Sequence, residues 1–140
     1  MDQTIGFEVY GDTVAQAIPT GWMAVNPLTR LNSVGFDTNS GWDATNHRYV
    51  VQVPGKYHFY GRVMPYTMSY GIGMAYIIKN GNMAIQGQNC QLSTGTTPDV
   101  FGTIDCAVGD QIQLGYCHNY GGNVNVQWAV CMLGGFCVGA

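Results

Sequence analysis

Charged side chains are scarce in this sequence. Only 9% of its 140 residues are Asp, Glu, Lys or Arg, whereas globular domains usually carry about 25%. The five basic residues are scattered along the chain, so no patch of them could neutralise several phosphates, which argues against nucleic acid as a partner. A surface with so little charge favours association with other protein surfaces.

Helical periodicity and long apolar runs are also missing. The 20 glycines interrupt the chain too often for an apolar i, i+3, i+4 repeat to persist over a dozen residues. The longest apolar stretch, near 128–138, contains Gly134 and Gly135 and is too short to span a bilayer. The first residues are neither basic nor apolar, so we expect no signal peptide and no membrane partner, although a mature secreted fragment would look the same.

The five cysteines form no CxxC pair and no Cys/His cluster with the spacing of a zinc site. An odd number leaves at least one thiol unpaired within the chain. We expect free, mostly buried thiols that pack as small apolar residues, as in a protein assembled in a reducing cytoplasm. They are Cys90, Cys106, Cys117, Cys131 and Cys137.

Short strand patterns separated by turn residues fill the chain, and Asn80-Gly81 is the strongest hairpin signal among them. The clearest strand is Lys56–Met64, where one face is apolar and the other mixes aromatic and charged residues, which suits a subunit contact or a hydrated sheet. About nine or ten strands predict an all-β jelly-roll sandwich in a single domain, residues 1–140. The other segments with a strand pattern, short ones included, from which this number is estimated are Ile5–Tyr10, Val14–Ile18, Trp22–Val25, Leu31–Phe36, Trp42-Asp43, Tyr49–Val53, Gly73–Lys79, Asn82–Gly87, Val100–Val108, Gln111–Cys117, Val124–Met132 and Phe136–Val138.

A set of short motifs follows one another in a recognisable order: Phe36-Asp37-Thr38-Asn39, Trp42-Asp43, Arg48–Phe59, Lys79-Asn80-Gly81 and Gly109-Asp110-Gln111-Ile112. This order resembles the signature of the complement component 1q globular-head family over nearly the whole chain. The earlier Gln16–Pro19 with Trp22 is similar to the first strands of microbial and phage members. The chain departs from the pattern at Asn46-His47 and in its last strand, which lacks a phenylalanine-rich ending.

The resemblance implies a ten-stranded jelly roll of the tumour-necrosis-factor-like type, packed as a tight homotrimer. Aromatic residues line the three-fold axis in that superfamily. The trimer-interface residues expected on this basis are Tyr57, His58, Phe59, Tyr60 and Trp128.

The sequence shows no constellation for catalysis. Its three histidines form no HxH or helical pair, and no G-x-S-x-G motif is present, so we expect neither enzyme activity nor a cofactor. Asp37 and Asp43 flank one polar loop that could hold Ca²⁺, as in some relatives. The alternative is that both carboxylates cap their own backbone in turns.

Four tyrosines stand near Gly- and Asn-rich loops, where rigid rings with polar tips suit the binding of glycans or proteins. The alternative is that these tyrosines pack in the contacts between the subunits of the trimer. The four are Tyr66, Tyr70, Tyr116 and Tyr120.

These features predict a non-enzymatic trimeric knob on a virion surface, assembled in a host cytoplasm. The first hypothesis is a phage capsid decoration or cement protein bound to the major capsid protein or another virion protein. One alternative is the receptor-binding tip of a phage tail fibre that recognises a host glycan or protein. Another is an extracellular, secreted ligand-binding module. A polysaccharide-cleaving spike would need paired carboxylates in a groove, which the sequence does not show.

Overall fold

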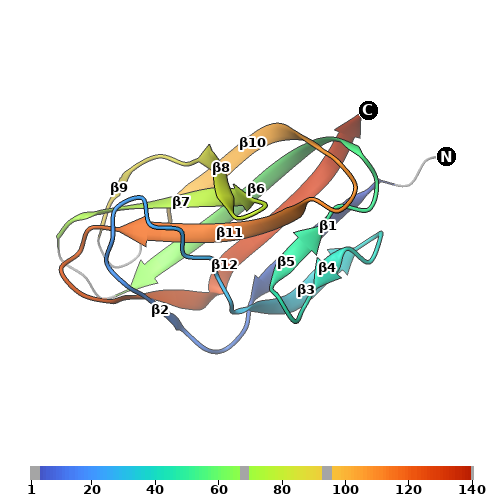
Figure 1. Ribbon diagram of the computed structural model, residues 1–140. Helices are drawn as coiled ribbons and strands as arrows, with labels where there is room; N and C mark the ends of the chain where they lie inside the picture. Colours follow the sequence, from blue (N-terminus) through green and yellow to red (C-terminus); the bar gives the residue numbers. More distant parts are fainter. Residues whose placement is uncertain (1–3, 67–69, 93–95, 140) are drawn as a thin grey trace.

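The computed structural model describes residues 4–66, 70–92 and 96–139, without the side chains of 127–129. All regular secondary structure in these residues is β-strand (Figure 1). The strands are β1 (Gly6–Gly11), β2 (Gln16–Ile18), β3 (Leu31–Asp37), β4 (Trp42–Asp43), β5 (Arg48–Val50), β6 (Gly55–Tyr66), β7 (Ile72–Lys79), β8 (Asn82–Gln86), β9 (Cys90–Gln91), β10 (Asp99–Cys106), β11 (Gln111–His118) and β12 (Val124–Gly139).

Two antiparallel sheets pack face to face and confirm the expected all-β jelly-roll sandwich. Sheet A has the strand order β10-β6-β12-β1-β3, with β2 paired to the first part of β12. Sheet B has the order β4-β5-β11-β7-β8, with β9 paired to the start of β7. Gly6, the first residue of β1, pairs with Phe136 near the end of β12, so the first strand begins and the last strand ends at the same end of the sandwich (Figure 1).

The β7–β8 connection is the hairpin that the sequence predicts. Asn80 and Gly81 both have positive φ, 52° and 85°, the combination that a tight two-residue hairpin requires. Asn80 also binds the neighbouring β10–β11 turn, where its side-chain amide donates to Asp110 at 3.0 Å. The β7–β8 and β10–β11 turns are therefore joined by a hydrogen bond, at the end of the sandwich where β12 ends.

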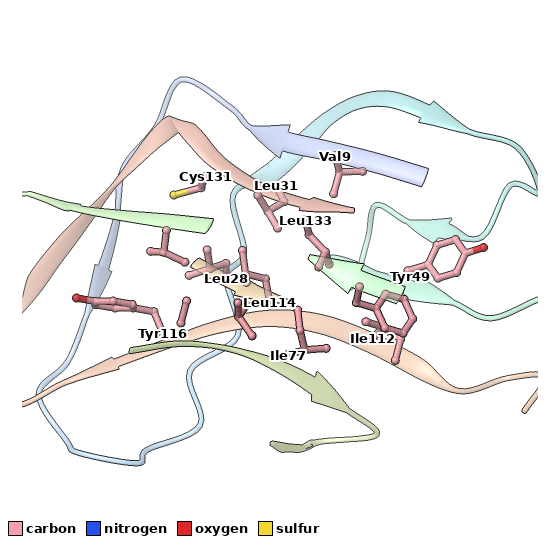
Figure 2. Packing of buried hydrophobic residues seen from close by; sticks show 14 of the residues in the cluster. Val9, Leu28, Leu31, Tyr49, Ile77, Ile112, Leu114, Tyr116, Cys131 and Leu133 are labelled. Atoms are coloured by element: carbon pink, nitrogen blue, oxygen red, sulfur yellow. The ribbon is translucent and has the colours of Figure 1, made fainter. Parts of the chain in front are cut away.

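The core lies between the sheets and is built from the inward residues of the alternating strand patterns. Phe7 and Tyr49 stack across it with ring centroids 3.9 Å apart. Figure 2 shows Leu114 and Leu133 near the middle of this core, with Tyr49 and Tyr116 toward its opposite ends. Each large apolar side chain buried in this way contributes about 1.5–3 kcal/mol to folding.

Apart from strand boundaries that differ by a few residues, three segments differ from the sequence prediction. Trp22–Val25 forms no strand, because it is held in a loop by side-chain hydrogen bonds from sheet B. The two strands expected over 124–132 and 136–138 are one continuous strand, β12, which bends through register shifts instead of ending. The two-residue strand β9 (Cys90–Gln91) lies where the sequence predicts no strand.

Candidate interaction surfaces

The outer face of sheet B is closed by the chain itself. Met74, Tyr76, Ile78 and Cys117 form a second small apolar cluster on that face. The hydroxyl of Tyr76 donates to the carbonyl of Ala24 at 2.7 Å and accepts the backbone N–H of Asn26 at 2.7 Å. These hydrogen bonds hold the loop between β2 and β3 over the apolar cluster. The loop therefore shields the cluster from solvent.

On the outer face of sheet A, no described segment covers the aromatic residues in this way. Phe101 on β10 is 67% exposed and Phe136 on β12 is 38% exposed. The His58 ring lies between them on β6, with centroids 6.4 Å from Phe101 and 5.5 Å from Phe136. Phe36, on the edge strand β3, is 46% exposed. Such a concentration of exposed rings over one sheet is characteristic of an interaction surface.

A carboxylate with two tyrosines stands in the middle of the same face. The hydroxyl group of Tyr10 donates a hydrogen bond to Oε1 of Glu8, and the hydroxyl group of Tyr60 donates one to Oε2. The bond to Glu8 is the main cause that raises the pKa of Tyr10. Burial, followed by the bond to Glu8, raises the pKa of Tyr60. Both phenols therefore stay protonated as donors, and both oxygens of the carboxylate accept hydrogen bonds from within the chain.

Of the five residues expected at a trimer interface, His58 and Tyr60 lie on this outer face, both half-buried. Tyr57 and Phe59 were wrongly expected there: both are fully buried between the sheets, because alternate residues of β6 point to opposite faces. Trp128 lies on β12, in the short stretch whose side chains are outside the described part of the structure.

Two hollows adjoin Phe101 at the edge of sheet A. One has a volume of about 190 Å³ and is lined partly by Tyr60, Arg62 and Met132. The other has a volume of about 280 Å³ and is lined partly by Gln86 and Gln88. Both are smaller than the roughly 300–1,000 Å³ of most small-molecule sites. They suit the side chains of a facing macromolecule better than an enclosed substrate.

A second surface forms at the end of the sandwich opposite the chain termini, here called the distal end (Figure 1, left). It carries Tyr70, 56% exposed, whose ring centroid is 4.7 Å from that of Tyr120. Tyr66, 40% exposed, ends β6 on the same side. Tyr116 was wrongly expected at this surface: it is fully buried, because it points inward from β11 into the core.

The carboxylates of Asp37 and Asp43 cap turns. Asp37 accepts the backbone N–H groups of Gly41 at 3.0 Å and Trp42 at 2.8 Å. Asp43 accepts the N–H of Asn46 and lies 3.4 Å from Nε of Arg48. These contacts agree with the turn-capping alternative, and no cluster of three metal-ligating side chains occurs among the described residues.

The five cysteines carry thiols that are not joined in disulfides in the described structure, as expected from their number and spacing. Cys106, Cys117 and Cys131 are buried, whereas Cys90 and Cys137 are half-buried. Burial raises the pKa of Cys106 and of Cys131 to about 11. These two thiols are therefore uncharged packing residues at neutral pH.

Comparison of the backbone with solved structures finds the same arrangement of sheets elsewhere. The globular domain of the zebrafish complement 1qA protein matches with a TM-score of 0.65 and 12% identity, over 97% of this chain and 98% of that one. The fold is that of the complement 1q and tumour necrosis factor proteins. The Eiger TNF of S. frugiperda matches this TNF-like chain with a TM-score of 0.69 and 11% identity, over 96% of this chain and 92% of the other.

Murine APRIL also shares the TNF-like jelly roll, with a TM-score of 0.62 and 13% identity over 97% of this chain and all of the other. The sequence itself matches no protein-family model and no curated protein. The likeness is therefore one of fold, carried by the sheet topology. The described part of this jelly roll contains no helix that is long and apolar enough to cross a bilayer.

Proposed function

We propose that this chain works without catalysis as a homotrimeric knob whose subunits meet through the outer face of sheet A. The observation that carries the proposal is the contrast between the two outer faces. The chain covers the apolar residues on sheet B with its own loop, held by Tyr76. It leaves Phe101 and Phe136 exposed on sheet A.

Burial of these rings against neighbouring subunits would remove apolar area from water, the main driving force of association. The satisfied Glu8 carboxylate lowers the cost of burying this face, because both its oxygens already accept hydrogen bonds within the subunit. The fold shared with complement 1q and TNF proteins supports the same assembly.

We further propose that the trimer is displayed on a virion surface. As a capsid decoration it would bind the major capsid protein or another virion protein. The free thiols support assembly inside a cell. The second candidate is a receptor-binding tip, which the exposed tyrosines at the distal end favour, because they face away from the chain termini by which a tip would be attached.

The assembly is tested by the native mass of the purified chain in light scattering. We expect the mass of three chains. The variant Phe101→Glu should shift the mass to that of one chain, because it places a charge on the buried contact. Val108→Glu is the matched control: Val108 is 63% exposed and lies on the β10–β11 turn, away from the aromatic face, so this variant should remain trimeric.

A wild-type chain that is monomeric at micromolar concentration would refute the trimer. So would a Phe101→Glu variant that keeps the full mass while its circular dichroism shows a native fold. In virions that lack the protein, heads sensitive to heat or osmotic shock would support capsid decoration. Intact heads that no longer adsorb to cells would support the receptor-binding tip.

A further inference from the structure

Charge is distributed unevenly over this molecule. The sequence contains no Asp, Glu, Lys or Arg after Asp110, and none in 63–78 or 80–98. The described segments 19–26, 70–72, 88–92 and 119–123 meet at the distal end, and all four are free of such residues. Their polar side-chain groups are the amides and hydroxyls of Asn, Gln, Thr and Tyr, the indole N–H of Trp22 and the thiol of Cys90.

Hydrogen bonds join these segments into one surface. Asn119 accepts the N–H of Ile72 through its side chain at 2.7 Å and donates its own N–H to the carbonyl of Ile72 at 3.1 Å. The N–H of Leu92 reaches the carbonyl of Gly71 at 2.8 Å, and the N–H of Gly21 reaches that of His118 at 3.0 Å. Loops that lie far apart in the sequence are thus tied together.

The buried His118 holds the backbone of Tyr120 in place through hydrogen bonds. Its Nε2 donates to the carbonyl of Ile18 at 2.8 Å, and its Nδ1 accepts the N–H of Tyr120 at 3.1 Å. The ring of Tyr120 packs on the core and lies beside Tyr70. A side chain at position 121 would meet the Tyr70 hydroxyl at 2.8 Å, so glycine there leaves room for the ring.

We propose that this distal surface is a binding site for a neutral saccharide, with Tyr70 as the ring on which a sugar stacks. The inference rests on the proposed function only in that a displayed knob presents the site to a surface rich in glycans. Sugars combine an apolar C–H face with many hydroxyl groups. They therefore match a half-exposed aromatic ring surrounded by neutral donors and acceptors.

The absence of charged residues from this surface favours neutral saccharides over anionic ones. Sialylated or sulfated glycans carry anionic groups, which proteins usually bind through Arg or Lys. No such residue occurs in the four described segments of the distal end. The same neutral surface provides no charge-assisted contact for a strongly acidic or basic peptide.

The full-length chain, fluorescently labelled, is applied to a printed panel of gluco-, manno- and galacto-oligosaccharides together with sialylated and sulfated oligosaccharides. We expect retention on at least one neutral saccharide and on none of the acidic ones. Tyr70→Ala should weaken the retained interaction about tenfold or more, since it removes one aromatic face. Tyr70→Phe keeps that face and should bind within a few-fold of the wild type.

Val108→Ala, at the opposite end of the sandwich, is the control and should bind as the wild type does. Retention on acidic glycans alone, retention on none of the panel, or unchanged binding by Tyr70→Ala would overturn the inference. The native mass separates this result from the proposed assembly. A trimer that binds no saccharide refutes only the site, whereas a monomer that binds through Tyr70 refutes only the trimer.

Discussion

Tyr60 lies across Gly134, its direct partner on the neighbouring strand β12, and thereby reaches Glu8 on the strand beyond. On the other sheet, Tyr76 lies in the same way across its partner Gly115 and reaches the loop at Ala24. In both places the missing side chain of a glycine provides the space for a tyrosine ring. A hydroxyl group then connects elements that are not adjacent in the sheet.

Gly134→Ala tests the first of these relationships. A Cβ at position 134 would lie 2.5 Å from the Tyr60 ring, so the ring must move and its bond to Glu8 is lost. We expect the free energy of unfolding to fall by about 1–3 kcal/mol, measured by urea denaturation at fixed protein concentration. Gly122→Ala, where a Cβ meets nothing within 4 Å, should change it by less than about 0.5 kcal/mol. Equal effects would contradict the explanation.

Tyr76→Phe should loosen the loop that covers sheet B. The change leaves the N–H of Asn26 and the carbonyl of Ala24 without their partner, at a cost of about 1–3 kcal/mol. Hydrogen exchange at Asn26 should accelerate accordingly. Tyr116→Phe is the matched control, because the buried hydroxyl of Tyr116 has no hydrogen-bond partner among the described residues. It should leave stability unchanged or slightly raised.

Asp110 should contribute to stability above pH 4. Its hydrogen bond from Asn80, followed by that from the Ala107 N–H at 2.8 Å, lowers the pKa of this carboxyl. A lowered pKa in the folded state means that the contribution is present above the unfolded value of about 3.9 and is lost as the pH falls through the folded value.

Asp110→Ala should therefore cost about 1–2 kcal/mol at pH 7 and flatten the loss of stability in acid. Urea midpoints measured from pH 2 to pH 7 give both quantities. Asp105→Ala removes an exposed carboxylate that faces the exposed Lys56 at 3.2 Å. This control should change little, since exposed ion pairs contribute about 0–1 kcal/mol.

The buried thiols predict a loss of stability in alkali. The pKa values of Cys106 and Cys131 are about 11 in the folded chain, against about 8.5 for an exposed thiol. Their contribution is complete below pH 8.5 and is lost as the pH rises toward 11, because the unfolded chain releases these protons first.

Each such thiol adds a slope of up to about 1.4 kcal/mol per pH unit in that window. Cys131→Ala should lower stability at every pH through the cavity it leaves, but should make the dependence between pH 8.5 and pH 10 shallower. An unchanged slope in urea denaturation would show that Cys131 does not titrate as its burial implies.

Local patterns in the sequence were sufficient for much of the fold. Asn80-Gly81 predicts its hairpin because both residues tolerate positive φ. The alternation in Lys56–Met64 separates an apolar face from a mixed one, since side chains on a strand alternate between faces. The motif order from Phe36 to Ile112 indicated the jelly roll that the backbone shows.

The β-structure, the hairpin turns and the scarcity of charge therefore follow from local patterns and composition. The tertiary structure decided which apolar residues stay exposed. Trp22–Val25 is apolar enough for a strand, yet it becomes a loop because Tyr76 binds Ala24 from 52 residues away. The uncharged distal end likewise arises only when segments from four parts of the chain meet. Strand alternation is a local property, whereas the covering of a face depends on contacts between residues distant in the chain.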